Sequence, residues 1–246
     1  MPRHSRRFDR RIRRLLAQSP PELQALTREH VEALRQHDIA TFNRLLALVR
    51  QADGDLELRN KACWLLGQLP DRRGVPALVA TLNDPSAGWV RWVAACQLAC
   101  LGGGMAVEAL VTALLTSPDA DQREAAAHGL NFGIHPRAFD PLQQALGNQD
   151  EKPRVRAQAA ESLHGYCSPY YASRSIPHLL SALHDPDPEV RFWSVYALSQ
   201  LAGEEVIPEL ERLAATDYAE VQYLHPVSEE AKWAIGEIRR RLEEGG

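Results

Sequence analysis

The sequence predicts an all-α fold, a right-handed α-solenoid of about six helix–turn–helix repeats. Three observations predict it. A stretch with the pattern of Asp185–Gly203 recurs along the chain, a second apolar stretch with leucines one turn apart precedes each copy, and turns rich in Asp, Pro and Ser separate the two. Neither helix of such a pair can bury its apolar stripe alone, so neighbouring pairs must stack.

The second helix of each repeat is aligned on an arginine. A small residue follows it at the third position and a leucine or isoleucine at the seventh, which places both on one helical face. These helices are predicted at residues 57–69, 89–101, 121–133, 154–166, 189–198 and 227–238. Their arginines are Arg59, Arg91, Arg123, Arg156 and Arg191, and in the last copy Ser228 takes the arginine's place, as suits a terminal repeat.

The first helix of each repeat is shorter and richer in leucine. These helices are predicted at residues 41–49, 74–82, 106–115, 139–146, 175–183 and 206–214. Four of them carry a proline, which a first helical turn tolerates because the missing N–H would have had no partner there: Pro76, Pro141, Pro177 and Pro208. Aspartate and serine in the intervening turns are expected to cap the following helix.

Three segments make up the predicted organisation. Residues 1–38 are expected to hold a basic amphipathic helix and a capping helix, residues 39–240 the repeat array, and residues 241–246 a tail. The amphipathic stretch 8–16 has two interpretations, a cap over the first repeat or a basic arm for an acidic surface. Two links, 166–175 and 216–226, are longer than the others and rich in tyrosine, which is typical of functional loops.

Composition narrows the class of protein. The 246 residues are 45% hydrophobic and 24% charged, without the run of about 18 apolar residues that a membrane span needs. A secretory signal is not expected, and four cysteines without paired spacing favour a reduced, cytoplasmic setting. The net charge is −4 although seven arginines fall within residues 1–14, so the body is acidic and nucleic-acid binding is not expected.

The Asp-Pro turn, the Val-Arg pair and the alanine-rich helix that follows resemble HEAT repeats, in particular the HEAT-like repeats of phycobilisome lyases. The resemblance covers about residues 40–240. It implies that a turn aspartate and the helix arginine pair along the stack as a ladder. The matching aspartates are Asp84, Asp150 and Asp185, and the matching arginines Arg91, Arg156 and Arg191, in one row with Arg59 and Arg123. It also implies that the second helices line a concave surface.

The variable columns of the second helices supply the candidate binding residues. Positions one, five and eight after the aligned residue lie opposite the core, and the residues there vary between repeats, whereas the core columns do not; Trp193 stands at position two. Exposed large aromatic side chains among polar groups are typical anchors of protein interfaces. The alternative is that these rings pack between neighbouring helices. The candidates are Trp64, Trp92, His128, Glu161, Phe192, Trp193 and Tyr196, joined by Tyr170 and Tyr171 of the first long link.

The function expected from these features is a protein-binding scaffold or adaptor, without catalytic residues, metal or cofactor. One alternative is a bilin lyase, in which His128, Glu161 and His164 would hold a pigment; this rests on the resemblance alone. A HEAT-like DNA glycosylase is a third alternative, which the acidic body disfavours. No small-molecule ligand is expected, since the sequence contains no paired zinc-ligand spacing, His-Glu dipeptide or glycine-rich phosphate loop.

Overall fold

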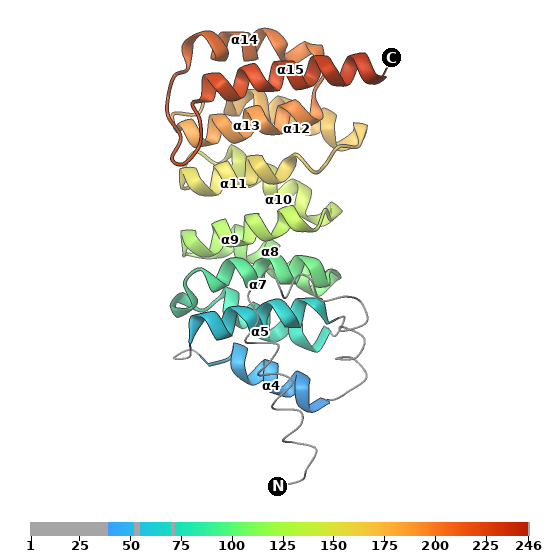
Figure 1. Ribbon diagram of the computed structural model, residues 1–246, viewed down its shortest axis with the longest axis vertical. Helices are drawn as coiled ribbons and strands as arrows, with labels where there is room; N and C mark the ends of the chain where they lie inside the picture. Colours follow the sequence, from blue (N-terminus) through green and yellow to red (C-terminus); the bar gives the residue numbers. More distant parts are fainter. Residues whose placement is uncertain (1–38, 52–54, 70–71, 246) are drawn as a thin grey trace. The chain divides into compact units, whose positions relative to one another are not determined.

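All regular structure in the described part of the chain is helical. The computed structural model describes residues 39–51, 55–69 and 72–245, and it contains twelve α-helices there, labelled α4 to α15, and no strand (Figure 1). The all-α fold expected from the sequence is therefore confirmed. The helices predicted within residues 1–38 lie outside the described residues.

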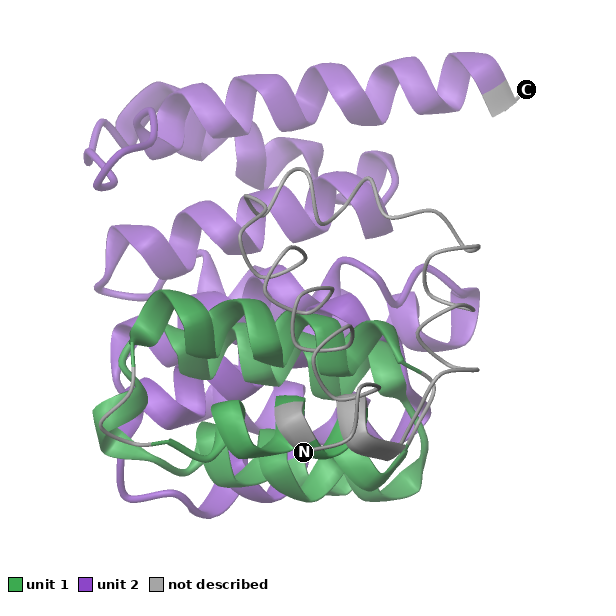
Figure 2. Ribbon diagram, turned by 60° about the horizontal axis from the view of Figure 1, so that its bottom comes forward, with its two compact units in different colours: residues 1–109 green, residues 110–246 purple. Residues whose placement is uncertain are grey.

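The chain forms two compact units, Met1–Ala109 and Leu110–Gly246 (Figure 2). In the first unit α4 packs on α5 and α6 on α7, while α5 also lies along α7 and α4 along α6. Two helix pairs thus stack in two layers, and the boundary between the units falls within α8. The helices are α4 (Ile39–Val49), α5 (Leu56–Gln68), α6 (Val75–Leu82), α7 (Val90–Leu101) and α8 (Gly104–Thr116).

The second unit repeats this arrangement. The pairs α10–α11, α12–α13 and α14–α15 stack so that α9, α11, α13 and α15 follow one another in one layer, with α10 beside α12 in the other. The helices are α9 (Ala120–Phe132), α10 (Pro136–Gly147), α11 (Pro153–Leu163), α12 (Pro169–Ala182), α13 (Pro188–Leu201), α14 (Ile207–Thr216) and α15 (Val227–Gly245). Helix α15 continues through residues 241–245, which the sequence analysis set apart as a tail.

Aspartate side chains cap three of the second helices, whereas α7 and α11 have no side-chain cap. In α5, α9 and α13 the carboxylates of Asp55, Asp119 and Asp187 each accept a hydrogen bond from the backbone N–H two residues later, at 2.9 Å. Each bond satisfies a donor that has no partner within the helix. The expectation for Pro141 and Pro177 is wrong: α10 begins at Pro136 and α12 at Pro169, so both prolines lie inside helices.

Small residues hold the layer of second helices together. The alanines three positions after the arginine are fully buried in α5, α7, α9 and α11, and the leucines seven positions after it are fully buried as well. The Ser162 hydroxyl in α11 donates to the carbonyl of Ala127 in α9 at 3.0 Å, so these two backbones lie close together. At Gly67 of α5 a Cβ atom would lie 2.5 Å from the Cβ of Gln97 in α7, which leaves room for glycine only.

The two long links differ. Residues 166–175 are mostly helix, because α12 already begins at Pro169, so the expectation of a loop there is wrong. The stretch between α14 and α15 is a loop whose ends are tied: the N–H of Ser228 donates to the carbonyl of Asp217 at 2.8 Å. At its tip Tyr223 has φ 63° and is 95% exposed. A non-glycine residue in this left-handed conformation is uncommon and strained.

Candidate functional site

The side chains of the aligned arginines form hydrogen bonds and ion pairs with residues of their own and of neighbouring repeats. In the first unit the Arg59 guanidinium donates to the Asp84 carboxylate at 2.7 Å and to the carbonyl of Val49 at 2.9 Å. Arg91 donates through Nε to the backbone carbonyl of Asp84 at 2.8 Å. Each of these arginines thus connects its own helix to the turn that contains Asp84.

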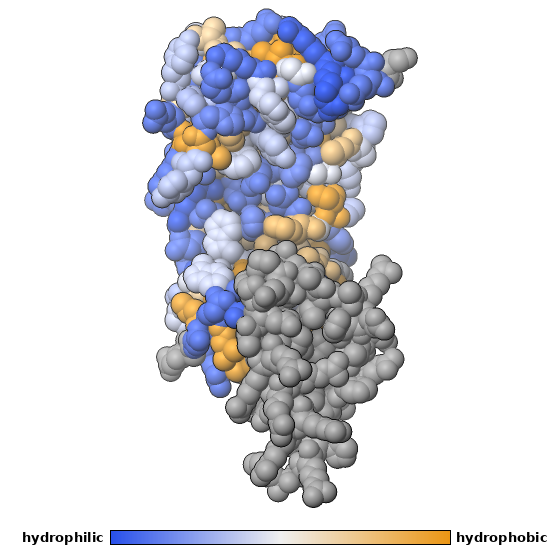
Figure 3. Space-filling view, in the orientation of Figure 1, coloured by the Kyte–Doolittle hydropathy of each residue, from blue (hydrophilic) through white to orange (hydrophobic). Residues whose placement is uncertain are grey.

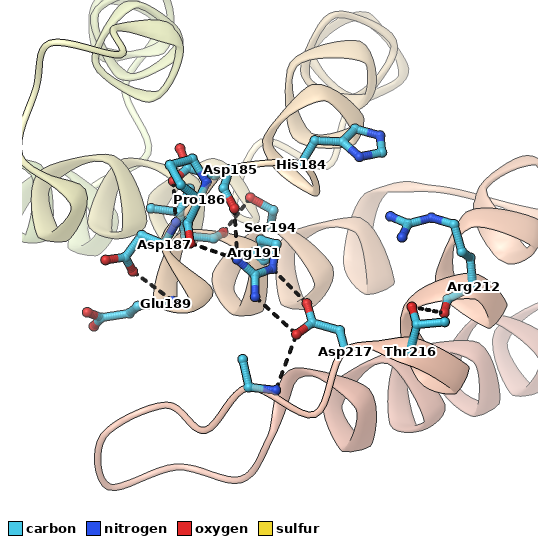
Figure 4. A network of polar contacts seen from close by, with 12 residues as sticks. His184, Asp185, Pro186, Asp187, Glu189, Arg191, Ser194, Arg212, Thr216 and Asp217 are labelled. Atoms are coloured by element: carbon cyan, nitrogen blue, oxygen red, sulfur yellow. Dashed lines mark hydrogen bonds and ion pairs between the residues drawn. The ribbon is translucent and has the colours of Figure 1, made fainter.

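The second unit shows the same contacts in three repeats. Arg123 binds both oxygens of Glu151 at 2.7 and 2.6 Å, and Arg156 both oxygens of Asp185 at 2.9 and 2.8 Å. Figure 4 shows Arg191 between the carbonyl of Asp185 in its own turn and the carboxylate of Asp217, which it binds at 2.6 and 3.0 Å. Two parallel bonds to one carboxylate are the strongest geometry that an arginine offers.

The acidic members of this ladder differ from those that the sequence suggested. Asp84 and Asp185 bind the arginine of the preceding repeat, and Glu151 rather than Asp150 binds Arg123. The turn directs the carboxylate of Glu151 at the arginine, whereas the backbone N–H of Asp150 is held by the Asn148 side chain. Asp217 was missed because it ends α14 without the Asp-Pro signature.

The arginines of the ladder keep its carboxylates charged. Burial by itself raises the pKa of Glu151 and of Asp217. The hydrogen bonds from Arg123 and Arg191, together with backbone hydrogen bonds and the arginine charges, outweigh burial and hold both pKa values below the usual range. The carboxylates are therefore charged and fully engaged. Side chains that are already paired in this way are not free for a reaction or a ligand.

The candidate site is a cluster on the second helices of unit 2, called here the acidic–aromatic face. Its rings are close to one another: His164 and Tyr196 lie 5.3 Å apart between centroids, and Trp193 and Tyr196 5.6 Å. Tyr196 and Trp233 stack nearly parallel, at 10° and 6.4 Å. The face consists of Glu161 and His164 from the α11 repeat, Glu189, Trp193 and Tyr196 from α13, and Trp233 from α15.

These side chains meet because they occupy equivalent positions of stacked helices. Glu161, Tyr196 and Trp233 each stand five residues after the aligned residue of their helix, so helices that pack in register bring them into one column. Trp233 is 47% exposed, and the other members are partly exposed. Trp233 stands in the same column of the sequence, five positions after Ser228, but it is not among the candidates named from the sequence.

Phe192 does not belong to this surface. It is only 3% exposed, because the loop between α14 and α15 covers it and the ring of His225 lies 5.2 Å from it. The expectation that Phe192 anchors a partner is therefore wrong, and for this side chain the alternative of packing against neighbours holds. His128 in α9 is partly buried, beside Phe132 at 5.0 Å.

The remaining candidates are spread over both units. Trp64 and Trp92 are partly exposed side chains of α5 and α7 in unit 1. Tyr171 packs on Phe139 at 4.6 Å, whereas Tyr170 is 64% exposed. Burial raises the pKa of the neighbouring Tyr166 to about 12. The tyrosines of the first link are thus largely a packed cluster on α10.

Half-buried carboxylates surround the rings. Burial raises the pKa of Glu161, and the charge of Glu189 adds to this against the opposing hydrogen bond from Gln158. Burial also raises the pKa of Glu189, with the charge of Asp187 adding and a hydrogen bond from Trp193 opposing. Glu189 lies outside the variable columns, so no pattern in the sequence marks it as a site residue.

Metal binding and cysteine reactivity were the other kinds of chemistry considered for the described residues. Within the described residues no group of three or more His, Cys, Asp or Glu side chains is placed to hold a metal ion. Burial raises the pKa of Cys63 and of Cys96 to about 12, so neither is an activated thiolate. None of the described helices combines the length and the apolar character that crossing a membrane would take.

The comparison with known families agrees with the stacked helix pairs of the structure. The model of HEAT repeats matches residues 42–131, 107–173 and 139–224, which together cover most of the chain. The chain is a HEAT-repeat protein. A crystal structure of an engineered protein is similar to it in fold, with a TM-score of 0.52 and 20% identity, covering 81% of this chain and 97% of that one.

Three curated relatives carry different activities in their names. The bilin biosynthesis protein PecE of Mastigocladus laminosus is 35% identical over 113 residues, 44% of this chain and 42% of the relative. The phycocyanobilin lyase subunit alpha of a Picosynechococcus species is 28% identical over 207 residues, 79% and 67% respectively. Deoxyhypusine hydroxylase-B of Oryza sativa subsp. japonica is 33% identical over 139 residues, 55% and 44%. The chain thus spans less than half of two of these relatives.

Proposed function

We propose that this HEAT-repeat chain is a non-catalytic scaffold that binds a segment of a protein partner on the acidic–aromatic face. The observation that carries the proposal is the stack of Tyr196 and Trp233, in which a tryptophan remains 47% exposed in a layer whose core columns are filled by alanine and leucine. Large aromatic side chains such as tryptophan and tyrosine dominate the energies of protein interfaces.

Polar groups complete the surface. Around the rings lie Glu161, His164 and Glu189, which can direct hydrogen bonds to a bound backbone or side chain. On the face of unit 2 that Figure 3 shows, the surface is mostly hydrophilic with small, separate apolar patches. A partner that binds here gains specificity from polar contacts around an aromatic centre, the usual anatomy of a non-obligate interface.

The test is capture of partners by the full chain from its native cells, followed by mass spectrometry. The double variant Tyr196→Ala/Trp233→Ala is expected to lose a partner that the wild type retains, at unchanged helical content in circular dichroism. Trp89→Ala in unit 1 is the matched control, because Trp89 is 48% exposed and thus comparable to Trp233. A partner that the double variant holds as well as the wild type would refute the site.

Handling of a bilin is the second candidate, and the names of two relatives favour it. The rings of Tyr196 and Trp233 could stack on a flat tetrapyrrole, but the carboxylates of Glu161 and Glu189 would repel its propionates. Coexpression with phycocyanobilin and an acceptor phycobiliprotein tests it: a covalent, fluorescent adduct that depends on this chain would replace the scaffold proposal. DNA binding fits poorly with carboxylates at this position.

A further inference from the structure

Two carboxylates of the acidic–aromatic face lack a strong counter-charge. The groups that oppose the raised pKa of Glu161 are Gln158, through a hydrogen bond of 2.5 Å, and His164, an imidazole that is charged only when protonated. For Glu189 the opposing group is the neutral Trp193 side chain. Neither carboxylate has an ion pair with a lysine or arginine of the described residues.

Most other carboxylates with little exposure bind an arginine, and Glu230, which pairs with His225 at 2.7 Å, is an exception. The ladder carboxylates Asp84, Glu151, Asp185 and Asp217 all bind arginines. Glu124, which also feels the charge of Glu189, has an ion pair with Arg154 at 3.3 Å. Half-buried carboxylates are stable when a cation and hydrogen bonds compensate their lost hydration. At Glu161 and Glu189 no lysine or arginine of the described residues supplies such a cation.

The rings beside these carboxylates prefer the same kind of ligand. The faces of tyrosine and tryptophan rings carry partial negative charge and attract cations, most often arginine. Tyr196 lies near Glu161, since the carboxylates of Glu161 and of Glu230 both raise its pKa, after burial as the main cause. Trp233 stacks on it and remains 47% exposed.

We infer that the occupant of the acidic–aromatic face is a basic, arginine-containing segment of a protein partner, with guanidinium groups bound to Glu161 and Glu189 and stacked on Tyr196 or Trp233. This inference rests on the proposed function and adds the chemistry of the partner. Arginine fits better than lysine, because its planar guanidinium binds a carboxylate through two parallel bonds and stacks on a ring at the same time.

The experiment measures binding of labelled peptides to the full chain by fluorescence anisotropy at physiological ionic strength. The probes are three peptides of equal length, in which glycine alternates with arginine, with lysine or with glutamate. The arginine peptide is expected to bind most tightly, the lysine peptide more weakly and the glutamate peptide not at all. A chain that does not bind the arginine peptide, or that binds the glutamate peptide equally well, would overturn the inference.

Charge-removing variants test whether the arginine peptide binds to this surface or is attracted by the overall negative charge of the protein. Glu161→Gln/Glu189→Gln keeps the shape and removes two charges, and it is expected to weaken binding of the arginine peptide at least about tenfold. The control Glu204→Gln/Glu243→Gln removes two charges from exposed positions outside the face and is expected to change affinity less than about twofold. Equal losses in both variants would overturn the inference.

The two proposals can fail separately. A cellular partner that is lost from Tyr196→Ala/Trp233→Ala but retained by Glu161→Gln/Glu189→Gln would leave the scaffold in place and overturn the basic partner. A partner retained by both variants would overturn both proposals. Loss from both, with the control variant behaving as wild type, is the result that the inference requires.

Discussion

The ion pair of Arg156 and Asp185 gives the most direct test of how this chain is stabilised. The two side chains are only 3% and 1% exposed, and they share two hydrogen bonds, of 2.9 and 2.8 Å. Replacing Arg156 by methionine keeps an unbranched side chain but leaves the Asp185 carboxylate buried with the N–H of Asp187, at 2.9 Å, as a remaining partner. Breaking a buried pair from one side costs about 3–5 kcal/mol.

Urea unfolding followed by far-ultraviolet circular dichroism measures this free energy, as a shift of the midpoint at an unchanged slope. The control is Arg212→Met, which removes the partner of Glu209 in a pair that is 45% and 30% exposed. Exposed pairs contribute about 0–1 kcal/mol, so this variant is expected to be close to wild type.

A second replacement tests the physical reason. In Arg156→Met/Asp185→Asn the buried charge is gone and the amide oxygen still accepts from Asp187, so the double variant is expected to be more stable than Arg156→Met alone. If Arg156→Met costs no more than the Arg212→Met control, or if the double variant is less stable than the single one, the account of the ladder is wrong.

Two further predictions concern close packing and pH. Gly67→Ala is expected to destabilise the first unit by about 1–3 kcal/mol, since the new Cβ would lie 2.5 Å from the Cβ of Gln97. Gly147→Ala is expected to stabilise the second unit by about 0.5–1 kcal/mol, because no atom lies within 4 Å of the new Cβ. Thermal unfolding of both variants checks these opposite signs. The lowered pKa values of Glu151 and Asp217 mean that their contribution is present above the unfolded-state pKa and is lost as the pH falls through the folded-state values. Urea midpoints are therefore expected to fall on acidification below the ordinary carboxyl range, where carboxyls with raised pKa values such as Glu161 and Glu189 are already protonated. A midpoint that rises below that range would contradict the role of the ladder.

Much of the fold follows from local pattern. Leucine and alanine recur with helical period, and aspartates such as Asp119 and Asp187 cap the helices that follow, so the helix pairs can be located without a structure. The periodicity fixes which side of a helix a residue occupies, and it is why the column of Tyr196 and Trp233 could be written down from the sequence. It does not fix the distance between side chains of different helices.

The acidic partners of the ladder arginines cannot be predicted from the local sequence pattern. The arginines stand at a constant position, but the acid that each one binds depends on how the turn of the next repeat is folded. Glu151 reaches Arg123 while Asp150 does not, and Asp217 reaches Arg191 although it lies at the end of a helix. A turn of a few residues has several conformations of similar energy, and packing of the next helix pair selects among them.

The sequence by itself determined that this chain is a series of paired helices, because an apolar stripe repeated with helical period can be buried only against a neighbour of the same kind. Only the tertiary structure decided the composition of the candidate site. It buried Phe192 beneath His225 of a later loop, and it placed Glu189 of one helix beside Glu161 of another. These relations join residues far apart in the chain, and stacking in three dimensions, not sequence spacing, sets their distances.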